Sequence, residues 1–325
     1  MNSERPLRRV SVVIPVYRGQ STLPRVIQEL EQFTHEQKTP KGVGFVVSEV
    51  ILIHDCGPDN SDAVIEELSA AHTFVKPVWL TRNYGQHSAT LAGMASATGD
   101  YVATMDEDGQ QDPAFIGAML DIAERGYQIV YGKPTNPPPH GMFRNVASRT
   151  AKRIAAFLLG NRSVTMFNSF RLVEGGIARS LAAYCGSGVF LDVALFWITS
   201  GAAQCPVTLR REMGRPSGYS FIRLVRHFWQ LILTSGTKPL RLITVLGFGS
   251  LVLACCITVY ALYAKFALKI PVQGWASIVI VVAFFSGCIL MSLGVIAEYL
   301  AVTMSIVMGK PLYLVSHKPT RHPNQ

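Results

Sequence analysis

Short apolar runs alternate with amphipathic segments through the first part of the chain. The runs are rich in Val and Ile and end in turn-forming residues, whereas the segments between them repeat apolar positions at helical spacing. The predicted strands are Val10–Pro15, Phe45–His54, Val75–Leu80, 101–105 and Tyr127–Tyr131. The predicted helices run from Ser21 to about Gln37, from a cap at Asn60 or Ser61 to Leu68, and from about Gln86 to Ala97. This order predicts an α/β fold with a mostly parallel sheet covered on both faces.

Polar or aromatic residues follow each predicted strand. Ligands of open parallel sheets bind outside the carboxyl ends of the strands, so we expect these residues to line one cleft. They are Tyr17, Asp55, Arg82 with Asn83, Asp106 with Asp108, and Lys133. No GxGxxG follows the first strand and no P-loop motif occurs, which argues against dinucleotide and P-loop sites.

Asp106 and Asp108 form the most informative pair of carboxylates. In an extended segment, residues two apart point to the same side, so both side chains can aim at one point. Carboxylate oxygens that leave coordination positions open suit Mg²⁺ or Mn²⁺ shared with the phosphates of a substrate. The alternative is ordinary turn chemistry, for which Asp and Gly are common.

The second part of the chain is strongly apolar. The chain has 325 residues, of which 49% are hydrophobic, and no charged residue occurs in Leu242–Ala264 or in Ile270–Ala297. Each run exceeds the roughly 20 residues that cross a bilayer, which predicts two transmembrane helices. Met1–Arg9 is short and polar, without the apolar core of a signal peptide. We therefore expect the residues before the spans to stay on the side of the membrane where they are made.

The distribution of charge supports this orientation. Arg and Lys crowd the residues before the first predicted span and after the second, so both ends are expected to be cytoplasmic. The net charge of +9 is then explained by anionic lipid headgroups rather than by nucleic acid, because no aromatic and basic recognition module is visible. The six cysteines form no CxxC pair, which fits a reducing compartment.

Two basic amphipathic segments are expected to lie at the membrane interface. The alternative is that both pack on the sheet as surface helices. The predicted organisation is a catalytic domain at 1–220 that includes the basic helix 141–159, a juxtamembrane helix at 221–240, two transmembrane helices at 241–300, and a tail at 301–325. Residues 311–315 of the tail resemble a short strand, and an exposed strand of this kind can pair with a neighbouring protomer in a homo-oligomer.

Four motifs together resemble family 2 glycosyltransferases with a GT-A fold. They are VVIPVY at 12–17, HDCGPDN at 54–60, RNYGQH at 82–87 and MDEDGQ at 105–110. The two predicted spans make the chain similar to polyisoprenyl-phosphate glycosyltransferases, which include dolichol-phosphate mannose synthases and bacterial undecaprenyl-phosphate sugar transferases. The resemblance implies an inverting transfer of one sugar from a nucleotide sugar to polyprenyl phosphate, with UDP as the favoured carrier and GDP as the alternative. It also implies a bacterial inner-membrane location, Mn²⁺ or Mg²⁺ as cofactor, and a homotetramer.

The resemblance also implies roles for individual residues. The metal would be held by Asp106, Asp108 and Gln110, and Asp108 would also be catalytic; Glu107 and Gly109 receive no role. The nucleotide would contact Pro15, Tyr17, Asp55, Arg82 and Asn83. The acceptor phosphate and the diphosphate would contact Lys133, Arg144, Ser148, Arg211 and Arg215.

The chain departs from the family pattern at several positions. Lys133 stands where the family has arginine, which keeps the charge but loses the bidentate geometry. Ser169 stands where some members carry aspartate, so no catalytic base is assigned there. Asp192 is then a candidate catalytic residue, and the alternative is a helix-capping or buried, paired aspartate. The element around Arg211 and Arg215 has one extra residue, so which arginine contacts the diphosphate stays open.

Two other functions are weighed against single-sugar transfer. A processive polysaccharide synthase is disfavoured because the chain has only two predicted spans and lacks a QxxRW element. A non-catalytic nucleotide-binding membrane scaffold would be expected to lose one of the paired aspartates, and both are present.

Overall fold

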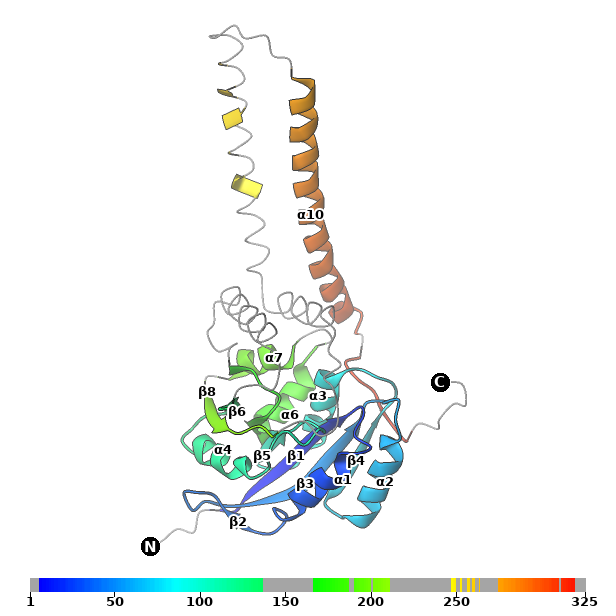
Figure 1. The fold of residues 1–325 in the computed structure, drawn as a ribbon, viewed down its shortest axis with the longest axis vertical. Coiled ribbons are helices and arrows are strands. Elements are labelled where there is room, and N and C mark those ends of the chain that lie inside the picture. The colour runs from blue at the N-terminus through cyan, green and yellow to red at the C-terminus, as the bar shows by residue number, and fades with distance from the viewer. Residues whose placement is uncertain are drawn as a thin grey trace.

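The computed structural model describes most of the amino-terminal part of the chain and the end of the apolar region. The described residues are 6–136, 166–186, 190–199, 201–210, 274–309 and 311–318, with short helical stretches between 247 and 263. Within them, a globular α/β body carries a long apolar helix that extends away from it (Figure 1).

The described strands form one mixed sheet. They are β1 (Arg8–Val16), β2 (Gln37–Lys38), β3 (Gly44–His54), β4 (Val75–Leu80), β5 (Tyr101–Thr104), β6 (Ile129–Pro134), β7 (Arg171–Glu174), β8 (Ala202–Val207) and β9 (Val315–Ser316). Their order is β8-β6-β7-β5-β1-β3-β4-β9, with β2 paired to β3 outside this path. The block β5-β1-β3-β4 is parallel, while β7 lies antiparallel between β5 and β6. The predicted parallel arrangement is therefore confirmed for the centre of the sheet.

Helices cover both faces of the sheet (Figure 1). The helices are α1 (Leu23–Glu31), α2 (Ser61–Ala71), α3 (Gln86–Ser96), α4 (Phe115–Ala123), α6 (Gly175–Tyr184), α7 (Leu191–Ile198) and α10 (Trp275–Val307). Side chains alternate between the faces, since Val12 and Leu52 pack with α1, α2 and α4, while Val13 and Ile53 pack with α3, α6 and α7. Two cores result, and the parallel strands between them read as continuous apolar runs because both of their faces are buried.

The predicted elements agree with the observed ones in order and differ at some ends. The helix expected to reach about Gln37 ends at Glu31, and Gln37–Lys38 form β2 against β3. Strands β7 and β8 were not predicted. The predicted strand at 311–315 is observed at Val315–Ser316, where it pairs with β4 of its own chain. The expectation that this segment pairs with a neighbouring protomer is thus not what the structure shows.

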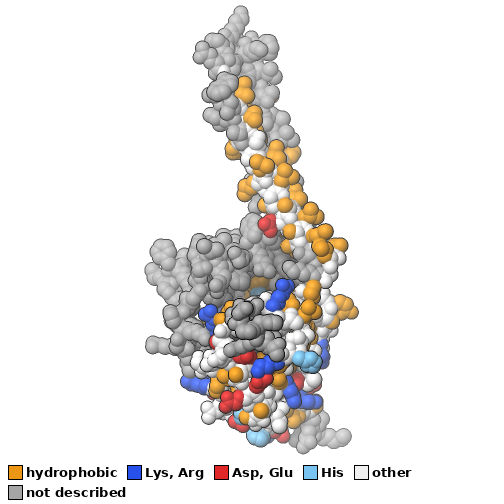
Figure 2. Space-filling model, turned by 90° about the vertical axis from the view of Figure 1, so that its right-hand side faces the viewer, with side chains coloured by type: hydrophobic (Ala, Val, Ile, Leu, Met, Phe, Trp, Pro, Cys, Tyr) orange, Lys and Arg blue, Asp and Glu red, His pale blue; other side chains and the backbone are white. Residues whose placement is uncertain are grey.

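Helix α10 is apolar and lies apart from both cores. It has 33 residues, and its segment Phe284–Met304 is long and apolar enough to cross a membrane, with none of that segment buried. Figure 2 shows apolar side chains along its visible face, whereas the charged side chains gather on the globular body. The predicted second span thus corresponds to a helix that continues past Ala297 to Val307. The first span lies largely outside the described residues, so a pair of transmembrane helices is not confirmed.

Candidate active site

The carboxyl ends of the parallel strands meet along one edge of the sheet. Val16 at the end of β1 lies beside His54 at the end of β3, which in turn lies beside Trp79 of β4. On the other side of β1, Val13 pairs with Thr104 at the end of β5. The residues that follow these strands are therefore neighbours, as the sequence predicted for the cleft.

The carboxylate of Asp106 is the centre of a hydrogen-bond network. Gln86 donates to Oδ1 at 2.7 Å, while Gln111 and Ser169 donate to Oδ2 at 2.7 and 2.5 Å. The side-chain amide of Gln111 also donates to Ser169 Oγ at 3.0 Å, and its oxygen accepts from the Asp106 backbone amide at 2.9 Å. Burial, helped by the charge of Asp108, raises the pKa of Asp106 to about 6, and the hydrogen bond from Ser169 opposes this rise. Neutral donors hold this carboxylate in one orientation.

Asp108 lies in a tight turn directly after Asp106. Its Oδ1 accepts a hydrogen bond from the backbone amide of Gln110 at 3.0 Å. Gly109 between them has a φ of 71°, a left-handed conformation that glycine adopts without steric cost. The carbonyl of Gln110 accepts from the backbone amide of Arg210 at 2.8 Å, which ties the turn to the segment after β8. The glycine that received no role from the sequence is therefore needed for the shape of this loop.

Glu107 connects the aspartate loop to the loop after β1. Its carboxylate accepts hydrogen bonds from the backbone amides of Tyr17 at 2.9 Å and of Arg18 at 2.9 and 3.1 Å. The sequence interpretation gave Glu107 no role, and the structure corrects this. In the sequence, the only signal for this contact was the position of Glu107 between two aspartates and after a buried strand.

Asp55 shapes the loop that follows β4. Its two carboxylate oxygens accept from the backbone amides of Tyr84 at 2.7 Å and Gly85 at 2.8 Å. Burial raises the pKa of Asp55 to about 6, although these two amides favour the charged form. The sequence predicted a contact between Asp55 and the nucleotide, which stays a prediction; the contact that the structure shows is with the backbone of the neighbouring loop.

The other residues predicted to bind the nucleotide surround the same edge. Tyr17 is exposed, with the guanidinium of Arg18 5.7 Å from its ring centroid, and Pro15 is half-buried. Arg82 and Asn83 are also exposed, and the guanidinium of Arg82 lies 4.8 Å from the ring centroid of Tyr84. A cation and aromatic rings are thus available beside the two aspartates.

Asp192 lies in a buried ion pair at the start of α7. It is 4% exposed, pairs with the guanidinium of Arg171, and accepts a hydrogen bond from the Tyr131 hydroxyl at 3.1 Å. Arg171 continues the network by donating through Nε to Thr104 Oγ1 at 3.2 Å. Of the two interpretations of Asp192, this geometry fits the buried, paired aspartate.

The residues predicted to bind the acceptor phosphate are described only in part. Lys133 is exposed at the end of β6. Arg144, Ser148, Arg211 and Arg215 lie outside the described residues, as do the basic helices predicted at 141–159 and 221–240. Arg210 is described and forms ion pairs with Glu29 at 2.5 Å and with Asp112 at 2.7 Å.

The aspartate loop fits a metal that is shared with a substrate. Within the described ranges, no group of three or more His, Cys, Asp or Glu side chains is placed to hold a metal by itself. Asp106 and Asp108 instead offer carboxylate oxygens at the open edge of the sheet, with Gln110 next to them. Such a donor set leaves coordination positions for the oxygens of a phosphate, as hard divalent cations prefer.

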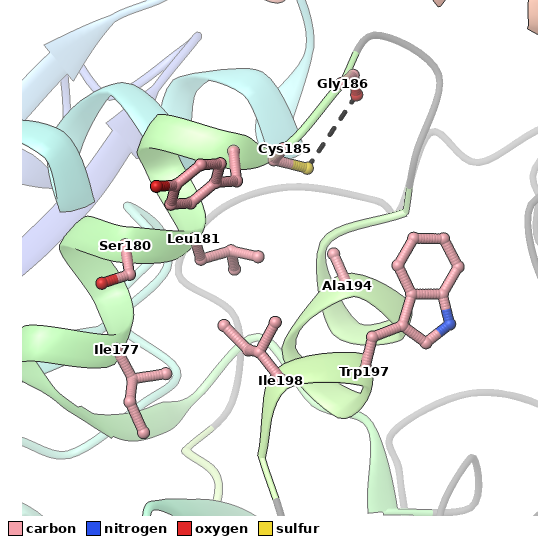
Figure 3. A pocket seen from close by; sticks show the side chains of 9 residues that line it. Ile177, Ser180, Leu181, Cys185, Gly186, Ala194, Trp197 and Ile198 are labelled. Carbon is pink, nitrogen blue, oxygen red and sulfur yellow. Dashed lines mark hydrogen bonds between the residues drawn. The ribbon is translucent and has the colours of Figure 1, made fainter.

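A separate apolar hollow lies between α6 and α7. It has a volume of about 420 Å³ and is lined by side chains such as Ile177, Leu181, Ala194 and Ile198 (Figure 3). Trp197 stands at one side and is 61% exposed. The described residues that line this hollow include no charged side chain, and apolar surface of this kind does not suit a nucleotide diphosphate.

Several solved structures are similar to this chain in fold. One is glucosyl-3-phosphoglycerate synthase from Mycobacterium tuberculosis with Mn²⁺, UDP and glucosyl-3-phosphoglycerate, which shares 18% identity over 71% of this chain and 80% of its own, with a TM-score of 0.51. The same enzyme with Mn²⁺, UDP-glucose and phosphoglyceric acid shares 17% identity over 71% of this chain and 79% of its own, with a TM-score of 0.51. Residues 1–349 of TarS from S. aureus with UDP-GlcNAc share 17% identity over 70% of this chain and 66% of the TarS chain, with a TM-score of 0.46.

The family itself is shown by the sequence match. The model for glycosyl transferase family 2 matches residues 11–180, which include β1 and the aspartate loop and extend through β7 into α6. The match covers more than half of the chain and contains each of the four motifs described above. This chain belongs to glycosyl transferase family 2 and is a glycosyltransferase with a GT-A fold.

Proposed function

We propose that this glycosyltransferase transfers a single sugar, with inversion, from a nucleotide sugar to polyprenyl phosphate at the cytoplasmic face of a bacterial inner membrane. The observation that carries the proposal is the presence of two features in one chain. The Asp106–Asp108 loop lies at the carboxyl edge of the sheet, and an apolar helix with no buried segment follows the catalytic domain.

The donor side is supported by the loop and by the enzymes of similar fold. The M. tuberculosis structures hold Mn²⁺ together with UDP or UDP-glucose, and UDP is accordingly the favoured carrier over GDP. Asp106, Asp108 and Gln110 would hold Mn²⁺ or Mg²⁺ in this chain. The cation, when bound, neutralises charge that develops on the departing diphosphate. Tyr17 and Arg82 are exposed beside the loop, where they can contact the nucleotide.

The acceptor side is supported by the exposure of α10. A helix of 33 residues whose apolar segment has no buried part needs an apolar surrounding, and a lipid bilayer supplies it. On the globular body, Tyr184 and Trp197 are 87% and 61% exposed, and such aromatic side chains are typical of the membrane interface. A lipid-linked acceptor would reach the enzyme from that phase. Its phosphate is assigned to Lys133 and to the predicted contacts Arg144 and Ser148, whereas Arg211 or Arg215 would contact the diphosphate of the donor.

The acceptor chemistry requires little proton transfer. A phosphate monoester has a second pKa of about 6, so its oxygen is largely ionised at neutral pH and can attack the sugar directly. This agrees with the ion pair between Asp192 and Arg171, which leaves Asp192 engaged in the core. The proposed mechanism therefore relies on orientation and on charge stabilisation of the diphosphate, without a dedicated base.

A homotetramer remains part of the proposal, although β9 is already paired within its own chain.

The test is a transfer assay with the purified full chain in lipid nanodiscs. UDP-linked and GDP-linked sugars are each supplied with undecaprenyl phosphate and Mn²⁺ or Mg²⁺, and the glycolipid and the nucleoside diphosphate are both quantified. We expect equimolar products with one sugar per lipid and an inverted anomeric centre. Products with several sugars per lipid would support a processive synthase. Nucleotide binding without any transfer across the panel would support a scaffold.

A further inference from the structure

The chain returns to the globular body after α10 and docks beside the loop that follows β4. Residues 311–318, which we name the C-terminal strap, add β9 to the edge of the sheet, where Val315 pairs with Leu80 and Ser316 with Trp79. One step further, the backbone amide of Thr81 donates to the carbonyl of Leu314 at 3.1 Å. The strap therefore forms a hydrogen bond with the first residue of the loop itself.

The strap is also fixed on both sides of this hydrogen bond. Leu312 and Tyr313 pack against the core formed with α3, α6 and α7. At the other end, Lys318 Nζ pairs with Glu66 of α2 at 2.5 Å and lies 5.9 Å from the ring centroid of Trp79. These contacts dock the strap on elements of the catalytic domain.

The loop held by the strap carries the residues assigned to the donor. Thr81 Oγ1 lies 2.9 Å from the Tyr84 hydroxyl, and the ring of Tyr84 packs on the same core as the strap residues Leu312 and Tyr313. The amides of Tyr84 and Gly85 are held by Asp55. The loop 81–85 is thus fixed by Asp55 at one end and by the strap at the other, with Arg82 and Asn83 exposed between them.

The strap also limits how far the loop can lie from the apolar helix. Helix α10 ends at Val307 and β9 begins at Val315, so only residues 308–314 connect them. A fully extended segment of this length spans roughly 28 Å. The docking of the strap therefore ties the donor loop to the end of α10 by a short covalent connection.

We propose that the C-terminal strap is a positioning element for the loop 81–85, so that tight donor binding requires the strap to be docked on β4. The proposal rests on the proposed function, which assigns this loop to the nucleotide. The chemistry recognised at the loop is a nucleoside diphosphate with its divalent cation. The strap acts through the Thr81 backbone and the packing of Tyr84, without touching the donor itself.

Two variants release the strap and two retain it. Ser316→Pro removes the backbone N–H that faces Trp79 in the ladder and places a proline ring against β4. Tyr313→Ala removes part of the packing and is the milder change. Leu314→Ala keeps the backbone carbonyl that Thr81 uses and changes only a side chain that is 50% exposed, while Tyr313→Phe keeps the packing ring. The first pair is the test and the second pair is its matched control.

The affinity of the full chain for UDP is measured by calorimetry with Mn²⁺ in nanodiscs. We expect Ser316→Pro to weaken UDP binding about tenfold, the size expected from one backbone hydrogen bond with its packing. Tyr313→Ala should weaken it by a smaller factor, with the donor KM raised, kcat at saturating donor unchanged, and both controls equal to wild type. Unchanged UDP affinity in both strap-release variants would overturn the proposal.

Hydrogen–deuterium exchange separates this proposal from the proposed function, because it needs no nucleotide. We expect faster exchange of the amides at 81–85 in Ser316→Pro, with exchange in β1 and β5 unchanged. Equal exchange at 81–85 in wild type and variant would overturn the strap proposal, whatever the enzyme binds. A wild type that binds neither UDP nor GDP would contradict the proposed function, and the exchange result would still decide the role of the strap.

Discussion

Ser169 donates a hydrogen bond to Asp106 Oδ2 at 2.5 Å, although 63 positions separate the two residues in the sequence. The contact arises because β7 runs antiparallel to β5, with Arg171 opposite Thr104. The residues just before β7 therefore lie beside those just after β5. The hydroxyl of Ser169 therefore orients a predicted metal ligand.

Replacement of Ser169 tests this orienting role. Ser169→Ala should lower kcat/KM and the affinity for Mn²⁺ about tenfold, because the Asp106 carboxylate loses one of its donors and hydrogen bonds to charged groups contribute about 1.5–3 kcal/mol. Ser169→Thr should retain most of the activity. Mn²⁺ titrations of transfer, repeated with Ser69→Ala as a control at a half-buried serine of α2, check both statements. An unchanged Mn²⁺ dependence in Ser169→Ala would show that the hydroxyl does not orient the site.

The ion pair between Arg171 and Asp192 predicts a loss of stability. Asp192→Asn should lower the free energy of unfolding by about 3 kcal/mol, because a buried guanidinium is left without its counter-charge. The double variant Arg171→Leu with Asp192→Leu should recover part of this loss. Chemical denaturation followed by fluorescence, with the exposed Glu67→Gln as control, measures both. Full stability of Asp192→Asn combined with loss of transfer would instead identify Asp192 as a catalytic base.

The buried Asp55 predicts a dependence of stability on pH. Its folded pKa of about 6 is higher than the ordinary value of 3.8, so the folded protein binds the Asp55 proton more tightly than the unfolded chain does. The stabilisation from this proton is complete below the ordinary pKa and is lost as the pH rises to about 6. The loss is about 3 kcal/mol.

The comparison of wild type with Asp55→Asn isolates this effect, because other groups titrate equally in both proteins. Unfolding free energies measured between pH 4 and 7 should show the extra decrease in the wild type alone. Parallel curves for the two proteins would mean that Asp55 titrates with its ordinary pKa.

The central strands and the aspartate loop were predictable from the sequence. Strands β1 and β3 are buried on both faces along most of their length and therefore appear as largely apolar runs with turn residues after them. Asp106 and Asp108 follow such a run, and parallel strands bring their carboxyl ends together regardless of the exact strand order.

Contacts that depend on the antiparallel strand and on backbone amides were not predictable. β7 has only four residues, too few for a recognisable pattern, so neither its place beside β5 nor the contact of Ser169 with Asp106 could be inferred. Asp55 and Glu107 bind backbone amides of distant loops, and amides leave no signal in a sequence. Strand β9 has only two residues, which is also too few to indicate its partner. For this reason its pairing with β4 was not predicted, and a neighbouring protomer was considered instead.

The most direct test of the account is the dependence of sugar transfer on Asp108. Purified wild type and Asp108→Ala are compared in nanodiscs with undecaprenyl phosphate, a UDP-sugar and Mn²⁺, and the rate of glycolipid formation is measured. The account predicts a decrease of about a hundredfold or more, because the charge on the departing diphosphate loses its stabilisation. Undiminished turnover in Asp108→Ala would contradict the assignment of the metal site.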